Sequence, residues 1–195
     1  MNEVLLYSTI LLWVVVLFIG FTLFIIFRQF GEVYLSTGES IARDGIAIGD
    51  RVPLLNNRKT LNGQTVQVQT GKPTLMVFLS PTCEVCKDLI PDWNHAFHER
   101  NDIHFRVIVV GNKEKMVEMV NNQELKGEII PDENHSILEE HRVRVTPFAF
   151  ILDKQGVVRG KGLCNGMEHI HGLISYLNSD FVAVKGRGDK TSAPA

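Results

Sequence analysis

The sequence predicts an α/β domain, in which helices cover a central mixed sheet, behind one N-terminal transmembrane helix. Three observations support this fold class. Residues 4–27 form an uncharged apolar run, and residues 74–130 alternate short apolar runs with amphipathic helical patterns. Residues 147–162 are typical of an antiparallel hairpin. The 195-residue chain is long enough for one ordinary domain plus a smaller element.

The apolar run "VLLYSTILLWVVVLFIGFTLFIIF" at residues 4–27 predicts a transmembrane helix. At about 1.5 Å per residue it would extend about 36 Å, which exceeds a hydrocarbon core of roughly 30 Å. A cleaved signal peptide is the alternative. However, residues 1–3 carry no Lys or Arg, and residues 27–30 are a poor cleavage site. A soluble helix would show a polar face, which this run lacks. We therefore expect an uncleaved single-pass anchor.

Composition changes divide the remaining chain into three parts. Residues 28–48 mix charges and glycines with a few apolar residues, which predicts a tether. Residues 49–178 carry the regular patterns of the folded domain. Residues 179–195 end in a polar, small-residue stretch that predicts a flexible tail.

Regular elements can be predicted within the domain from hydrophobic periodicity. Asn62-Gly63 indicates a two-residue hairpin turn near the start of the domain. Short apolar runs typical of buried strands then alternate with longer amphipathic patterns. Expected strands cover residues 74–79, 103–110, 128–130, 147–152 and 157–162; expected helices cover residues 85–99, 113–125 and 167–177, with a turn or helix over 132–141.

The segment "SPTCEVCKDLIP" at residues 80–91 places two of the three cysteines in a CxxC pattern. Cys83 would end the loop after a strand, and Cys86 would lie in the first turn of the next helix. The unpaired N–H groups and partial positive charge of a helix N-terminus stabilise a thiolate at Cys83. Cys86 can then attack the mixed disulfide and release the product. The motif thus predicts thiol–disulfide exchange.

A metal site is the main alternative use of a CxxC. Structural zinc needs four ligands in tetrahedral reach, and there is no second CxxC. The seven histidines are scattered, and only His169 and His171 form a close pair. We therefore expect no metal and no cofactor. A formal net charge of −2 gives no electrostatic reason to expect nucleic acid.

Two motifs together resemble the thioredoxin-like superfamily. They are "FLSPTCEVCKDLIP", with Pro91 five residues after the second cysteine, and "VRVTPFAFILDKQGVV" at residues 142–158. The resemblance covers about residues 49–178. It implies that Pro147 is a cis-proline facing the dithiol, which leaves the backbone of Thr146 free to bind an extended substrate. An ordinary trans-proline opening an edge strand is the alternative.

The chain also resembles the membrane-tethered MauD family of methylamine utilization proteins. An N-terminal span, "IGDRVP", "TLNGQTV" and "KGLCNGMEHIHGLI" carry this resemblance. It implies a role in maturing methylamine dehydrogenase. The implied partners are disulfide-containing periplasmic proteins, including the small subunit of that enzyme, a membrane thiol donor and membrane lipid.

The orientation in the membrane receives conflicting signals. Arg28 and Arg43 both follow the span, and the positive-inside rule taken alone would place the domain in the cytoplasm. The MauD resemblance implies the opposite, because a dithiol partner of secreted proteins must face the oxidising side. We expect an inner-membrane protein with a periplasmic domain.

Several positions depart from thioredoxin itself. Val77 occupies the place of its buried acid, and Thr82 occupies the place of its tryptophan. Glu84 and Val85, between the cysteines, are the expected redox-tuning residues. The Glu84 carboxylate should disfavour a nearby thiolate, which favours the disulfide form. We therefore expect a reductant or isomerase.

Other functions are possible on the same fold. A tethered copper metallochaperone would have three residues between its cysteines, where this chain has two, and a dedicated histidine. A peroxidase would carry Thr-x-x-Cys, where this chain has Ser80. A non-catalytic assembly factor would not need the dithiol.

Three further residues are expected to have structural roles. We expect Cys164 to be an inert buried residue, and Trp93 and Phe97 to belong to the core.

Overall fold

The computed structural model describes residues 7–25, 44–66 and 71–177. It separates into a unit ending at Arg43 and a unit beginning at Asp44. In the first unit, the helix Tyr7–Ile25 has a mean hydropathy of 2.6 and is long and apolar enough to cross a membrane. Its apolar side chains are exposed along its length, which fits a single-pass membrane anchor. The ends of the predicted span, residues 4–6 and 26–27, lie outside the described residues.

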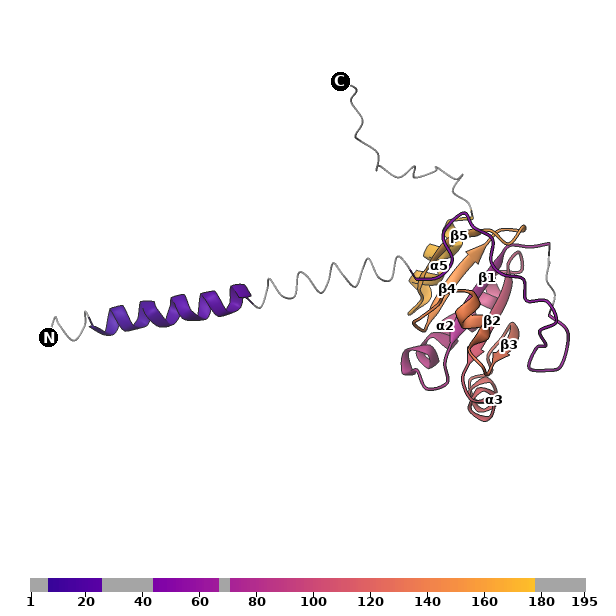
Figure 1. The fold of residues 1–195 in the computed structure, drawn as a ribbon, viewed down its shortest axis with the longest axis horizontal. Helices are drawn as coiled ribbons and strands as arrows, with labels where there is room; N and C mark the ends of the chain where they lie inside the picture. The colour runs from indigo at the N-terminus through magenta and orange to yellow at the C-terminus, as the bar shows by residue number, and fades with distance from the viewer. Residues whose placement is uncertain (1–6, 26–43, 67–70, 178–195) are drawn as a thin grey trace, which may run out of the picture. The chain divides into compact units, whose positions relative to one another are not determined.

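A five-stranded mixed sheet forms the centre of the second unit, with the order β3-β2-β1-β4-β5 (Figure 1). Strands β1, β2 and β3 are parallel to one another, whereas β4 is antiparallel to both β1 and β5. The strands are β1 (Thr74–Leu79), β2 (His104–Val110), β3 (Glu128–Asp132), β4 (Phe148–Leu152) and β5 (Val158–Leu163). This arrangement confirms the predicted thioredoxin-like α/β fold.

Strand β1 shows why the apolar runs become central strands. All six of its residues are buried, because successive side chains enter hydrophobic clusters on opposite faces of the sheet. Val77 joins the cluster on one face, and Met76 and Phe78 join the other. A strand covered on both faces therefore has a continuous apolar sequence instead of an alternating one.

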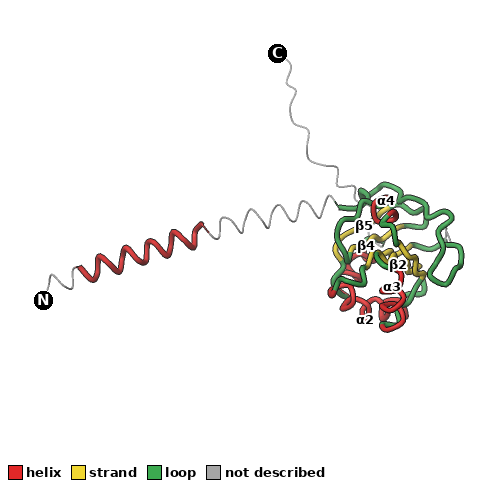
Figure 2. The backbone as a smooth tube through the Cα atoms, turned by 60° about the horizontal axis from the view of Figure 1, so that its bottom comes forward, coloured by secondary structure: helices red, strands yellow, loops and turns green. Residues whose placement is uncertain are grey.

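Helices and the N-terminal segment of the domain cover the two faces. Helices α2 (Glu84–Glu99), α3 (Lys113–Asn122) and α5 (Met167–Ser175) contribute their buried residues to the first cluster. Helix α4 (Ser136–Glu140) and segment 44–66 contribute to the second. Figure 2 shows α4 across the sheet from α2 and α3.

The folded domain begins earlier than predicted. Asp44, Gly45 and Ile46 are buried, and Ile46 belongs to the second hydrophobic cluster. Residues 44–48 thus belong to the domain, and the expected tether 28–48 ends sooner than its glycines and charges indicated. The rest of the tether, residues 28–43, lies outside the described residues, as do residues 178–195 at the C-terminus.

Two predicted elements differ in detail. The turn at Asn62-Gly63 contains three residues, 61–63, instead of two, because the Thr60 N–H bonds to Gln64 O at 2.8 Å. An antiparallel bridge between Lys59 and Thr65 follows it, and the Leu61 N–H bonds to Ile129 O of β3 at 2.8 Å. Strand β3 continues two residues beyond its predicted end, through Pro131 to Asp132. Because β3 is an edge strand, it can accommodate a residue without an N–H.

Candidate active site

Cys83 caps the N-terminus of α2, as the sequence predicted. It has an extended backbone, and its Sγ accepts a hydrogen bond from the Cys86 N–H at 3.3 Å. The side chain is partly exposed, and all three cysteines are free thiols. An electron-rich sulfur is therefore placed at the positive end of a 16-residue helix and remains accessible to a partner.

Cys86 is fully buried one turn further along α2. Burial, followed by its hydrogen bond with Cys83, raises the pKa of the Cys86 thiol from 9.0 to about 12. Cys86 consequently remains protonated at neutral pH. The two sulfurs thus differ in accessibility, with a partly exposed thiol in front of a buried one.

The loop before β4 lies against the dithiol. Its Thr146–Pro147 peptide bond is cis, as the resemblance implied, and Pro147 is buried. The Cys83 thiol lies 3.6 Å from Thr146 O, to which it donates a hydrogen bond. The fold thus brings Cys83, Cys86, Thr146 and Pro147 together, although the pairs are separated by about sixty residues in the chain.

The residues between the cysteines point outward. Glu84 is exposed, and its carboxylate pairs with Lys87 Nζ at 2.9 Å. The hydrogen bond that Lys87 donates to Glu84 raises the pKa of Lys87. Val85 is also exposed. Lys87 partly offsets the charge of Glu84. The expected effect of Glu84 on the redox properties of the cysteines stays a prediction.

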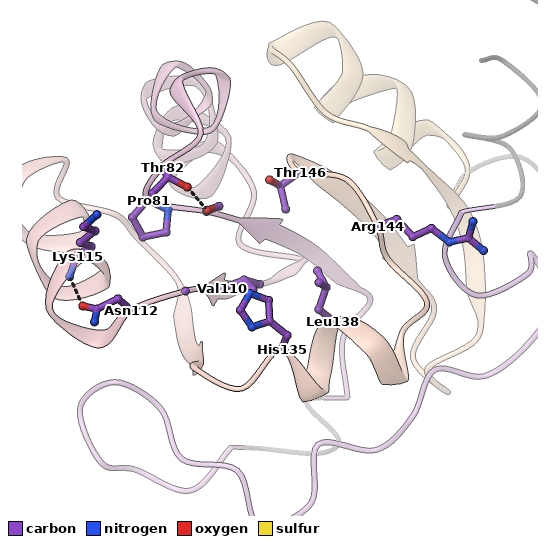
Figure 3. A pocket seen from close by; sticks show the side chains of 11 residues that line it. Pro81, Thr82, Val110, Asn112, Lys115, His135, Leu138, Arg144 and Thr146 are labelled. Atoms are coloured by element: carbon purple, nitrogen blue, oxygen red, sulfur yellow. Dashed lines mark hydrogen bonds between the residues drawn. The ribbon is translucent and has the colours of Figure 1, made fainter. Parts of the chain in front are cut away.

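A cleft of about 320 Å³ opens beside the dithiol (Figure 3). Thr82, which precedes Cys83, and Thr146 both line it. Val110 and Leu138 provide apolar surface, and Lys115 stands on the α3 side. An extended polypeptide that reached Cys83 could occupy this cleft alongside the Thr146 backbone.

Other candidate residues have structural positions. Cys164 is fully buried, and burial raises the pKa of its thiol to about 12, with the negative charge of Asp92 adding to the effect. Trp93 is buried in the first cluster, and Phe97 packs against that cluster. Val77 is fully buried. Because valine has no carboxyl group, this position supplies no acid near the dithiol. Within the described residues, no group of three His, Cys, Asp or Glu side chains could hold a metal ion.

Sequence reasoning missed Asp44 and Arg144. The Arg144 N–H donates to Asp44 Oδ2 at 3.0 Å across 100 positions of the chain. Asp44 is only 4% exposed. An Asp-Gly pair beside a charged, glycine-containing stretch gave no signal that its carboxylate would be buried against the loop that carries Thr146.

Fold and site together define a thioredoxin-like protein with a CxxC at a helix N-terminus and a facing cis-proline. The sequence profile of the AhpC/TSA family matches residues 48–161, and the chain belongs to this family.

Curated relatives match almost the whole chain. Methylamine utilization protein MauD of Methylobacillus flagellatus is 30% identical over 177 residues, which cover 86% of this chain and 83% of that protein. MauD of Methylophilus methylotrophus is 26% identical over 202 residues, covering 99% and 94% respectively. The similarity therefore includes the N-terminal region as well as the thioredoxin-like domain.

Solved structures share the fold of the domain. A secreted Mycobacterium tuberculosis disulfide oxidoreductase superposes with a TM-score of 0.55 at 18% identity, covering 60% of this chain and 92% of that one. StoA from Bacillus subtilis superposes with a TM-score of 0.54 at 18% identity, covering 66% and 99%.

Proposed function

We propose that this protein is a membrane-anchored thiol–disulfide oxidoreductase of the reductant or isomerase type, acting on disulfides of periplasmic proteins. The observation that carries the proposal is the position of Cys83. Its partly exposed sulfur caps α2, lies 3.6 Å from Thr146 O and is followed one turn later by the buried Cys86.

The proposed reaction begins with Cys83. Its thiolate attacks one sulfur of a client disulfide, and the other client sulfur leaves as a thiolate and takes up a proton. Cys83 is then joined to the client. Cys86 loses its proton and attacks Cys83 Sγ, which releases the second client thiol. The client disulfide is thereby reduced by two electrons, and the Cys83–Cys86 dithiol is oxidised to a disulfide.

A new cycle requires a thiol reductant, which returns two electrons to the Cys83–Cys86 disulfide. In isomerisation the client itself supplies the attacking thiol, so no net oxidation occurs. The proton of Cys86 must leave through the client thiolate or water, because Val77 provides no carboxylate in this core.

The relatives point to a client. Five curated relatives carry the name methylamine utilization protein MauD. Together with the exposed apolar helix Tyr7–Ile25, these names support a role at the inner membrane. The domain would then act in the periplasm on proteins such as the small subunit of methylamine dehydrogenase.

The proposal predicts a specific pattern of mutant activities. Wild-type protein in detergent should reduce a protein disulfide with dithiothreitol as the electron source. Cys83→Ser should abolish this activity, because it removes the nucleophile. Cys86→Ser that has been reduced and then freed of dithiothreitol should stop as a mixed disulfide with its client, because no resolving thiol remains. Cys164→Ser is the matched control and should retain activity. Full turnover by Cys83→Ser would refute the proposal and favour a non-catalytic role.

A further inference from the structure

We propose that Asp44 is a positioning residue, which holds the loop carrying Thr146 in the place where it can bind a client. This inference rests on the proposed function. Residues 44–46 are called the latch below, and residues 142–147 the Thr146 loop.

Two hydrogen bonds join the latch to the Thr146 loop. The Gly45 N–H donates to Arg142 O at 2.8 Å, and the Arg144 N–H donates to Asp44 Oδ2 at 3.0 Å. The two bonds are made at alternate residues of the loop, Arg142 and Arg144, as between two paired β-strands. Here, however, a side-chain carboxylate replaces one backbone acceptor. Within its N-terminal half, the loop is therefore fixed at two points.

The latch is itself fixed to the sheet. Lys161 Nζ, from β5, donates to Asp44 O at 2.6 Å and to Gly45 O at 3.1 Å. Gly45 has a φ of +72°, and a Cβ at this position would lie 2.7 Å from the ring of Phe150. Ile46 is 8% exposed. The latch therefore lies in a fixed place relative to β4 and β5, and the loop bonded to it is fixed relative to the same strands.

The environment of Asp44 indicates more than a packing role. Its side chain is 4% exposed, yet Oδ1 has no hydrogen-bond partner among the described residues. Two cations face it, the Lys161 ammonium and Arg144, whose Nε lies 3.8 Å from Oδ1. Burying a carboxylate with one oxygen unsatisfied is unfavourable. The hydrogen bond that the Arg144 N–H donates to Asp44 Oδ2 instead fixes the geometry of the loop.

The Thr146 loop lies directly against the sulfur of Cys83. The other end of the loop is held by the Cys164 N–H, which donates to Pro147 O at 3.2 Å. Thr146 lies between these fixed points, and its carbonyl oxygen is 3.6 Å from Cys83 Sγ. Loss of the Asp44 bond would leave the hydrogen bond from the Gly45 N–H to Arg142 O as the remaining one of the two bonds between the latch and the loop. A client whose backbone pairs with Thr146 would then meet a less ordered partner.

Asp153 offers a matched control for Asp44. Its carboxylate also accepts backbone hydrogen bonds, from the Gln155 and Val157 N–H groups at 2.9 Å each, and it pairs with Arg159. It lies after the opposite end of β4 from Thr146. Asp44→Ala and Asp153→Ala should both lower the melting temperature, but only Asp44→Ala changes the Thr146 loop.

The test compares two oxidants with the full-length reduced protein in detergent. One is a disulfide-bridged peptide, whose backbone can pair with Thr146, and the other is 2-hydroxyethyl disulfide, which has no peptide backbone. Asp44→Ala should lower the ratio of the peptide rate constant to the small-disulfide rate constant by about tenfold. Asp44→Asn, which keeps an oxygen acceptor, should restore most of the ratio, and Asp153→Ala should leave it at the wild-type value.

Each outcome has one meaning. An unchanged ratio in Asp44→Ala, or an equal fall in Asp153→Ala, would overturn the positioning role and leave Asp44 a stability residue. If wild-type protein reacted with neither disulfide, the proposed function itself would fail. An Asp44→Asn ratio as low as that of Asp44→Ala would show that charge, and not the hydrogen bond, sets the effect, which contradicts the inference.

Discussion

At the scale of single residues, the two cysteines of the CxxC segment are distinguished by burial. Cys83 is partly exposed at the end of α2, whereas Cys86 has no exposed surface. Burial disfavours the charged form of a thiol, and it is the main cause of the raised pKa of Cys86. In the proposed reaction, the accessible Cys83 sulfur therefore attacks the client, and Cys86 remains a thiol until the mixed disulfide has formed.

This difference predicts a pH-dependent second step. In reaction with dithiobis(nitrobenzoate), Cys83 should release one thionitrobenzoate, and attack by Cys86 should release the second. Because the Cys86 pKa is about 12, its thiolate fraction grows about tenfold per pH unit below that value. The second release, followed by absorbance, should therefore accelerate about tenfold per unit between roughly pH 6 and 9. A rate independent of pH in this range would show that Cys86 is already ionised.

At the scale of elements, α5 is capped by a residue of another helix. Its N-cap, Gly166, has no side chain, and Asp92 of α2 accepts a hydrogen bond from the Met167 N–H at 2.9 Å. This bond joins α2, which carries the cysteines, to α5, which covers the same face of the sheet. A carboxylate at a helix N-terminus also interacts favourably with the helix dipole.

Asp92→Ala should lower the free energy of unfolding by about 1 kcal/mol, as expected for the loss of an N-cap. Asp92→Asn retains an oxygen acceptor and should lose less. Asp88→Ala, one turn earlier on α2 and exposed, is the control and should change stability by less than about 0.5 kcal/mol. Urea unfolding followed by circular dichroism measures all three. Equal stability of Asp92→Ala and wild type would show that α5 needs no cap from α2.

The elements also show what sequence could predict. The continuous apolar run of β1 indicated a strand buried on both faces, and the CxxC after it indicated a helix N-terminus; both follow from local patterns. The pairing of Asp44 with the Arg144 N–H spans 100 positions and depends on tertiary packing. The ion pair between Glu84 and Lys87 requires a particular side-chain conformation, so the CxxC pattern alone could not predict it.

At the scale of the whole molecule, the chain combines an exposed apolar helix with a redox-competent domain. The helix Tyr7–Ile25 has no buried residue within its most apolar window. In water such a surface would associate or aggregate, whereas lipid would cover it. The sequence predicted this helix directly from its composition, but the charges at Arg28 and Arg43 gave an uncertain orientation.

The anchor and its orientation can be tested together. The full chain should remain in the membrane fraction after extraction at high pH with carbonate, and deletion of residues 7–25 should release it. A C-terminal alkaline phosphatase fusion should be active, because that enzyme needs the oxidising side of the membrane to form its disulfides. Complete carbonate extraction would contradict the anchor, and an inactive but well-expressed fusion would contradict the periplasmic orientation.

The central claim is that Cys83 and Cys86 form one reversible redox pair. The most direct measurement is disulfide mapping by mass spectrometry across a glutathione redox titration of the folded, full-length protein. We expect one disulfide, between Cys83 and Cys86, with Cys164 remaining a thiol, and a glutathione adduct on Cys83 in Cys86→Ser. A disulfide involving Cys164, or no disulfide at any potential in the titration, would contradict it.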